Sequence, residues 1–287
     1  RRQRQMCIRD SDIPAYTTAI ITLDNHTLSR PIINPEEIAN LRENAVTSSP
    51  DISEADLPAP SSSCTDFDVA FAIEDGHVRY GNRSILEGLD WTVRSGERWA
   101  LTGPNGSGKS LLLSLVCADN PQAYANRITL FDRRRGSGES IWEIKDRIGY
   151  VCPEMQLYFR SSLPVEEIVV GGKRNSLSQF RKATPDELDE ARTWLRLLDI
   201  SHLAERKFSE LSSGEQRLVL LARTFIKQAP LMILDEPLHG LDAERKERVR
   251  RLIDLLITRN RSTLIFVTHY TREIPETVTL TKTLTKL

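Results

Sequence analysis

The spacing of apolar residues predicts an α/β domain that begins near residue 66. Alternating apolar positions at Val69–Ile73 and His77–Tyr80 indicate strands with one buried face. Short continuous apolar runs are typical of parallel strands that are buried on both faces. Such runs occur at Trp99–Thr102, Ile148–Val151, Leu231–Leu234 and Thr263–Thr268.

Between these strands, apolar residues recur with the spacing of amphipathic helices. Lys109–Val116 is predicted to form a helix directly after a strand. The segment between Phe159 and Glu210 contains Thr184-Pro185-Asp186-Glu187, a capping box with proline at the first helical position. Two later helices carry apolar stripes at Leu218, Leu221, Ala222 and Phe225, and at Val249, Leu252, Ile253 and Leu256.

The N-terminal part lacks this regular pattern. Residues 1–11 are basic and aperiodic, and are either a flexible arm or non-native sequence. Residues 12–65 are expected to hold a remnant of a preceding domain and a linker rich in Pro and Ser, with Glu36–Ala45 as a candidate short helix. Asp12–Thr17 resembles Glu273–Val278, which indicates either the tail of a preceding copy of the domain or chance similarity.

Composition and charge narrow the range of partners. The 287 residues carry 39 basic and 40 acidic side chains, so no overall basic field favours nucleic acid or an anionic membrane. The run Arg133-Arg134-Arg135 is expected to be solvated. The apolar runs are far shorter than the roughly 18 residues of a membrane span, so the chain is not expected to be transmembrane. Four scattered cysteines without a CxxC pair indicate a reducing, cytoplasmic compartment.

A glycine-rich loop follows the strand predicted to end at Thr102. It reads Gly103-Pro104-Asn105-Gly106-Ser107-Gly108-Lys109-Ser110, and Leu111 continues into the predicted helix. Glycines let successive backbone N–H groups curl around a phosphate, and the helix N-terminus adds positive potential. We therefore expect a nucleotide site in which Lys109 contacts the β- and γ-phosphates and Ser110 binds Mg²⁺.

Two carboxylates close the apolar run Leu231–Leu234. Asp235 at the end of the strand is a candidate Mg²⁺ ligand, and Glu236 is placed to act as a general base on water. Taken alone, the pair would be interpreted as two solvated acids at a strand end. Its occurrence together with the glycine-rich loop favours the catalytic interpretation.

A serine- and glycine-containing turn opens the helix that carries Leu218. It reads Leu211-Ser212-Ser213-Gly214-Glu215-Gln216-Arg217. Such a turn at a helix N-terminus is either a second anion site or an ordinary serine N-cap.

In their order along the chain, the loop, this turn and the acid-terminated strand resemble the ATP-binding cassette (ABC) ATPase family. The resemblance implies an α/β fold of the P-loop NTPase type, with a RecA-like core and a mainly parallel sheet. An antiparallel β subdomain and an α-helical subdomain of ABC type would complete it. It also implies hydrolysis of Mg-ATP to ADP and phosphate. Each site would be completed across two cassettes, with Leu211–Glu215 as a signature turn that acts on the partner's ATP.

The resemblance extends to single positions. Tyr80 stands where the family stacks an aromatic ring on adenine. Gly240-Leu241-Asp242 resembles the D-loop that crosses to the opposite subunit, and His269 resembles the switch histidine that contacts the γ-phosphate. Lys109, Glu236 and His269 are thus the implied catalytic residues.

One segment departs from the family pattern. The family usually places a glutamine after the strand Ile148–Val151, where this sequence reads Cys152-Pro153-Glu154-Met155-Gln156. In the family this glutamine senses Mg²⁺ and links the helical subdomain to a partner. Glu154 and Gln156 are both candidates for its place.

A closer resemblance connects Trp99–Arg160 to the molybdenum-transport or photorepair-type ATP-binding proteins. It rests on Asn120–Asn126, Arg135–Trp142 and Gly149–Val151 with Pro153-Glu154. Members of this subgroup carry two cassettes in one chain and no membrane domain. The resemblance implies that residues 12–65 include the end of a first cassette and that residues 66–287 form a second ABC ATP-binding domain.

Two biological outputs stay open. The implied partner is a second cassette, in the same chain of a full-length protein or in a homodimer. The pair either energises transport through a membrane permease, with an implied link to molybdate and a place in the cytoplasm or at the inner membrane face, or acts as a soluble ATPase in DNA repair, translation or regulation. The missing glutamine and the implied first cassette favour the second output modestly.

Overall fold

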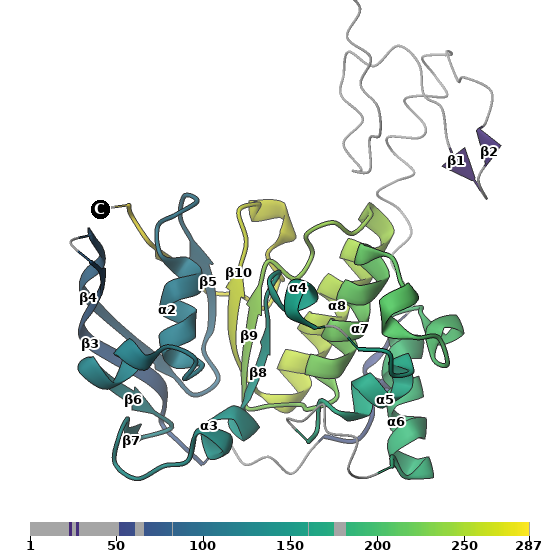
Figure 1. Ribbon diagram of the computed structural model, residues 1–287, viewed down its shortest axis with the longest axis horizontal. Coiled ribbons are helices and arrows are strands. Elements are labelled where there is room, and N and C mark those ends of the chain that lie inside the picture. The colour runs from purple at the N-terminus through teal and green to yellow at the C-terminus, as the bar shows by residue number, and fades with distance from the viewer. Residues whose placement is uncertain are drawn as a thin grey trace, which may run out of the picture.

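The computed structural model describes residues 23–24, 27–28, 52–60, 66–81, 83–159, 161–174 and 182–286 (Figure 1). At its centre lies a parallel sheet of five strands in the order β11-β5-β10-β9-β8. The four apolar runs predicted to be strands form four of its members. The strands are β5 (Arg98–Thr102), β8 (Ile148–Val151), β9 (Leu231–Asp235), β10 (Thr263–Val267) and β11 (Leu280–Thr283).

Alternate residues of the two central strands point into two separate cores. Leu231 and Ile233 of β9 pack into one core, whereas Met232 and Leu234 pack into the other. All five residues of β9 are buried, as are all five of β10. Strands of this kind need cover on both faces, which explains their continuous apolar sequence.

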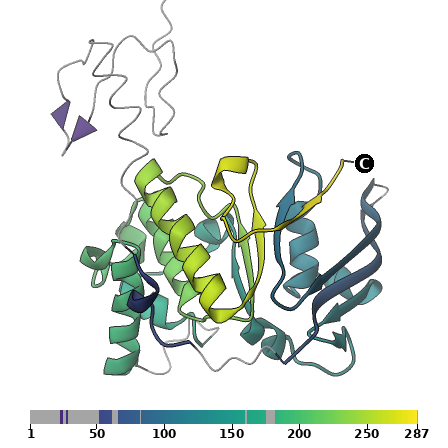
Figure 2. The ribbon, with the colours of Figure 1, turned by 180° about the vertical axis from the view of Figure 1, so that it is seen from behind.

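An antiparallel sheet and helix α2 (Lys109–Val116) cover one face (Figures 1 and 2). The two strands predicted around Ile73 and His77 form one strand, because register shifts against β4 on both sides of Gly76 absorb the break in alternation. In the order β4-β3-β6-β7, the strands are β3 (Val69–Tyr80), β4 (Arg83–Arg94), β6 (Arg127–Leu130) and β7 (Arg133–Arg134).

Helices cover the other face and form the predicted helical subdomain. Thr184 caps α6 through the capping box with Glu187, as the sequence predicted. Trp194 of α6 is fully buried and packs near Phe225 of α7. The helices of this face are α5 (Val165–Val170), α6 (Pro185–Leu197), α7 (Ser213–Phe225) and α8 (Ala243–Asn260).

Short elements connect these layers. Helix α3 (Ile141–Arg147) leads directly into β8, and α4 (Met155–Tyr158) follows β8. The 3-10 turns are Glu54–Asp56, Pro121–Ala125, Ser201–Leu203, Phe208–Glu210 and Thr271–Glu273.

The basic run that precedes Gly136 is not wholly solvated, contrary to expectation. Arg135 is only 8% exposed. Its guanidinium lies 3.3 Å from a carboxylate oxygen of Glu139 and donates to the hydroxyl of Tyr124. A buried charge needs such partners, and the sequence pattern alone does not reveal that Glu139 folds back to supply one.

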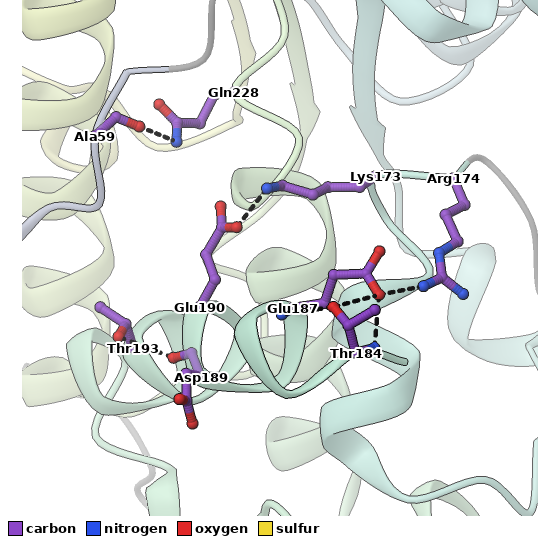
Figure 3. Close-up of polar contacts among 9 residues, drawn as sticks. All are labelled: Ala59, Lys173, Arg174, Thr184, Glu187, Asp189, Glu190, Thr193 and Gln228. Carbon is purple, nitrogen blue, oxygen red and sulfur yellow. Dashed lines mark hydrogen bonds and ion pairs between the residues drawn. The ribbon is translucent and has the colours of Figure 1, made fainter. Parts of the chain in front are cut away.

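Residues 52–60, here called the strap, belong to the segment expected to be a linker, yet they pack on the helical subdomain. Ile52 and Leu57 are 5% and 7% exposed and join the core of this face. Arg259 of α8 donates to the carbonyl oxygens of Leu57 and Pro58 at 3.0 and 2.5 Å. Figure 3 shows Gln228 donating to Ala59, close to the pair formed by Lys173 and Glu190. The strap runs beside α8 in Figure 2.

The N-terminal predictions lie mostly outside the described residues. Within residues 12–30, the structure describes only β1 (Leu23–Asp24) and β2 (Thr27–Leu28), which pair in antiparallel fashion. The candidate helix Glu36–Ala45 lies wholly outside them. The division at residues 1–11, 12–65 and 66–287 therefore stays a prediction. The strap shows that part of residues 12–65 packs on the domain predicted to begin at residue 66.

We expect Leu57→Ala to destabilise the cassette by ~2–4 kcal/mol, because it removes a buried side chain and leaves a cavity between the strap and the helices. Urea unfolding measures the effect, with Glu54→Ala as the control at an exposed position of the strap. Equal unfolding midpoints for the two variants would contradict a stabilising role of the buried Leu57 side chain.

Candidate functional site

The predicted catalytic residues converge along one edge of the parallel sheet. The glycine-rich loop follows β5, His269 lies just beyond β10, and Asp235 ends β9, so that three adjacent strands supply them. The next strand, β8, leads to Glu154 and Gln156. Because the carboxyl ends of parallel strands meet at the same edge, segments far apart in the sequence form one site.

The glycine-rich loop has backbone conformations that favour glycine. Gly103, Gly106 and Gly108 have φ angles of 143°, 76° and 91°. A Cβ atom on Gly103 would lie 2.5 Å from the carbonyl oxygen of Leu284 and 2.9 Å from Oγ of Ser107. The loop is thus packed closely against the segment that follows β11. It continues directly into α2, whose first-turn backbone N–H groups have no partner within the helix.

Two buried polar side chains of the loop fit a phosphate group. Lys109 is 7% exposed, and its Nζ donates to the carbonyl oxygens of Gly103 and Pro104 at 2.9 and 3.0 Å. Burial lowers the pKa of Lys109, although the carboxylates of Asp235 and Glu236 oppose this effect. Oγ of Ser107 is buried and has no hydrogen-bond partner in the described part of the chain. A phosphate oxygen would satisfy both groups.

The predicted Mg²⁺ ligands lie side by side. Oγ of Ser110 donates to a carboxylate oxygen of Asp235 at 3.0 Å. Burial raises the pKa of Asp235 to about 6, and the negative charges of Glu154 and Glu236 add to this effect. A divalent cation would relieve this repulsion, so the two oxygens fit Mg²⁺.

The side chains at this edge suit an ion that is shared with phosphate. Mg²⁺ commonly takes one or two carboxylates and completes its shell with phosphate and water oxygens. Within the described residues, no group of three or more His, Cys, Asp or Glu side chains could hold a metal by itself.

Glu236 is held in a left-handed backbone conformation with a φ of 46°. Its N–H donates to the carbonyl oxygen of Val267 at 3.0 Å. Its own carbonyl oxygen accepts hydrogen bonds from the N–H of His239 at 3.2 Å and from Nη1 of Arg217 at 3.0 Å. A left-handed residue with a side chain costs roughly 1–2 kcal/mol, and these three bonds hold it in place.

Two histidines face the carboxylate of Glu236. Nε2 of His269 lies 3.0 Å from one oxygen, as expected if the two residues act together. Nδ1 of His239 lies 3.9 Å from the other oxygen. Sequence reasoning missed His239, and the one available signal was its position three residues after Glu236, within reach of a tight turn.

The signature turn opens α7 with a complete capping box. The N–H and Oγ of Ser212 both donate to a carboxylate oxygen of Glu215 at 2.7 Å. Ser213 is exposed, whereas Leu211 is 7% exposed and packs into the core of the helical face. The N-cap interpretation and the anion-site interpretation are therefore compatible, because the cap leaves the side chain of Ser213 accessible.

The two candidates for the missing glutamine have different surroundings. Glu154 is exposed and close enough to Asp235 to raise its pKa. Gln156 instead accepts a hydrogen bond from Nη2 of Arg217 at 3.0 Å and donates to the carbonyl oxygen of Ser213. Glu154 thus acts electrostatically on the candidate metal ligand Asp235, whereas Gln156 contacts the signature helix.

Two further predicted residues, Asp242 and Tyr80, have local surroundings that are compatible with their predicted roles. Asp242 caps α8 by accepting from the N–H of Arg245 at 2.9 Å. A Cβ atom on Gly214 would lie 3.8 Å from the carbonyl oxygen of Gly240, so the signature turn and the D-loop are neighbours. Tyr80 ends β3 and is 54% exposed, as a platform for a stacked base would be. Its adenine role stays a prediction.

Comparisons with known proteins give a consistent picture. Residues 86–239 match the family model described as ABC transporter. The ABC transporter ATP-binding protein ModF of Escherichia coli is 36% identical over 94% of this chain and 56% of its own length. The hemin import ATP-binding protein HmuV of Streptomyces coelicolor is 37% identical over 68% of each chain. The first curated relatives are covered only in part, at 56% and 41% of their lengths.

A solved structure agrees in fold. It shows a metal-chelate type ABC transporter in an inward-facing conformation, with a TM-score of 0.58 and 28% identity over 76% of this chain and 81% of that chain. In the described ranges of the present structure, no helix is both long and apolar enough to cross a membrane.

We expect Asp235→Asn to stabilise the nucleotide-free protein at neutral pH. Between pH 4 and pH 6 the folded state binds the proton of Asp235 more tightly than the unfolded state, so stability falls as the pH rises. Above pH 6 the full penalty applies, and relief of this penalty is worth ~1–3 kcal/mol after the lost bond to Ser110 is allowed for. Thermal unfolding at pH 7.5 and pH 4.5 measures it. A gain that is equal at both pH values would contradict this origin.

Proposed function

The chain belongs to the ABC transporter family, and on that premise we propose that it binds Mg-ATP at Gly103–Ser110 and hydrolyses it with Glu236 as the general base. One observation carries the proposal. The loop, the pair Ser110–Asp235 and the pair Glu236–His269 stand on three adjacent strands, with 3.0 Å between the polar atoms of each pair. This arrangement supports the proposal of a phosphate cradle, a cation site and a base at one edge of the sheet.

The residues divide the chemistry between them. The oxygen of a water molecule attacks the γ-phosphorus while the bond from this phosphorus to the oxygen of ADP breaks, which releases ADP and phosphate. Glu236 accepts the proton of the water, and His269 orients the Glu236 carboxylate and contacts the γ-phosphate. Lys109 stabilises the charge on the phosphates. Mg²⁺ held by Ser110 and Asp235 would neutralise further phosphate charge.

We further propose that a second cassette completes each site. Helix α2, which follows the phosphate loop, and helix α7, which follows the signature turn, pack into the cores on opposite faces of the parallel sheet. The signature turn and the D-loop form one neighbouring surface through Gly214 and Gly240. A head-to-tail partner would present this surface to the ATP, either from a homodimer or from another cassette of a longer chain.

We expect Glu236→Gln to dimerise when Mg-ATP is added, because ATP stays bound while the activation of water is blocked. Light scattering measures the mass. Ser213→Arg in the same background should abolish the dimer by placing a bulky cation in the exposed turn. A variant of Glu236 that hydrolyses ATP at the wild-type rate would contradict the catalytic proposal, and a monomer that binds ATP would contradict self-pairing.

We propose transport as the biological output, with a membrane permease as partner. The named relatives are transporter components, so the non-transport alternative is not favoured. A groove of about 340 Å³ beside α3, β8 and α7 supports a partner, since Trp142 and Met155 line it together with Lys145. Trp142 is 62% exposed, and exposed aromatic side chains often anchor protein partners. The resemblance to molybdenum-transport proteins makes molybdate the first cargo to test.

We expect Trp142→Glu to reduce binding of the protein to native membrane vesicles roughly ten-fold, by removing an aromatic anchor and adding charge. ATP binding should stay unchanged. Co-sedimentation measures the bound fraction, and vesicles stripped with protease serve as the control. Equal binding to intact and stripped vesicles would argue against a permease.

A further inference from the structure

Arg217 is a buried arginine to which the catalytic roles above assign no task. It lies near the start of α7 and is 5% exposed. Its guanidinium spans the gap between two other segments. Nη1 donates to the carbonyl oxygen of Glu236 and Nη2 donates to Oε1 of Gln156, both at 3.0 Å. Gln156 in turn donates to the carbonyl oxygen of Ser213. A chain of hydrogen bonds thus joins the signature turn to the turn that begins at Glu236.

A buried guanidinium is costly, which argues that its two donors have a purpose. Burial lowers the pKa of Arg217, and the nearby carboxylates, including those of Glu236 and Glu154, only partly offset this effect. An apolar side chain of similar volume would avoid the cost of desolvation. What an apolar side chain lacks is the planar fork that directs two donors along fixed lines.

The target of one donor is Glu236, whose backbone is held in a left-handed conformation. Glu236 has its left-handed φ of 46°, and of its three backbone bonds, those to Val267 and His239 come from the neighbouring strand and from its own turn. The third bond comes from Arg217 on α7, a helix that packs into the core on the helical face of the sheet. A small movement of α7 is therefore transmitted directly to the backbone that aims the Glu236 carboxylate.

We propose that Arg217 is a positioning residue that holds the Glu236 carbonyl in its left-handed turn and, through Gln156, couples the aim of this carboxylate to the signature turn at Ser213. This inference rests on the proposed function. In the proposed pair, the signature turn of one cassette serves the ATP of the other. The chain Ser213–Gln156–Arg217–Glu236 then lets engagement at one ATP site set the base of the second site.

The test compares Arg217→Met with Arg223→Met in the 287-residue chain. Arg223 is a matched control, because it lies on the same helix, is partly buried and donates to the carbonyl oxygen of Ile168 instead of Glu236. We expect Arg217→Met to lower kcat roughly ten- to a hundred-fold, since a displaced base loses its near-attack geometry. Its affinity for ATP, measured with a fluorescent nucleotide, should stay within about two-fold of the wild type.

The second variant, Gln156→Met, keeps the bond from Arg217 to Glu236 and removes the link to Ser213. We expect it to retain most of kcat and to lose the cooperativity of ATP hydrolysis, so that the Hill coefficient falls to about one. A Hill coefficient that is unchanged by this variant, or already one in the wild type, would overturn the link through Gln156.

Three outcomes for Arg217→Met would overturn its role. These are a kcat equal to that of the wild type, an equal loss in Arg223→Met, and a loss of ATP affinity as large as the loss of kcat. Failure of the proposed function is distinguishable, since Glu236→Gln would then leave the hydrolysis rate unchanged. Wild-type hydrolysis that depends on Glu236 but not on Arg217 would remove this inference alone.

Discussion

The left-handed backbone at Glu236 is the constraint on which the site depends. Strand β9 is buried on both faces and ends at Asp235 at the edge of the sheet. The chain turns sharply at the next residue, Glu236. Glu236 makes that turn against its conformational preference, and partners from β10, from its own turn and from α7 hold it there. Glu236 therefore keeps this conformation only because elements of both cores are in place around it.

The electrostatics of this edge favour ligand binding over stability. Asp235 is buried beside the negative charges of Glu154 and Glu236, while Lys109 and Arg217 lose hydration by burial. Ser107 adds a buried hydroxyl without a partner among the described residues. A phosphate would relieve the costs at Ser107 and Lys109, and a cation would relieve the cost at Asp235, so these unfavourable terms of the free protein become affinity for the nucleotide and its ion.

Much of this architecture was predictable because its signals are local. Continuous apolar runs fixed the central strands, and residues adjacent in sequence form the glycine-rich loop and the capping boxes at Thr184 and Ser212. The missed features depend on contacts between distant segments. Arg217 meets Glu236 and Gln156 only in the fold, and Arg135 is buried because Glu139 folds back on it. The strap looks like a linker because Ile52 and Leu57 are its buried apolar residues, while Arg259 and Gln228 bind its backbone carbonyls, which leave no mark in its sequence. Composition and periodicity carry no record of such pairings.

The division of β9 and β10 between two cores bears on how the chain folds during synthesis. Neither core can close before Leu231 and the residues that follow it have left the ribosome, because both cores share these strands as a common wall. Several elements are synthesised before these strands, namely α2 and the antiparallel sheet on one side and α5 to α7 on the other. The apolar faces that pack against β9 and β10 stay uncovered until these two strands emerge. The order of synthesis therefore makes closure of both cores a late event, after β9 and β10 have emerged.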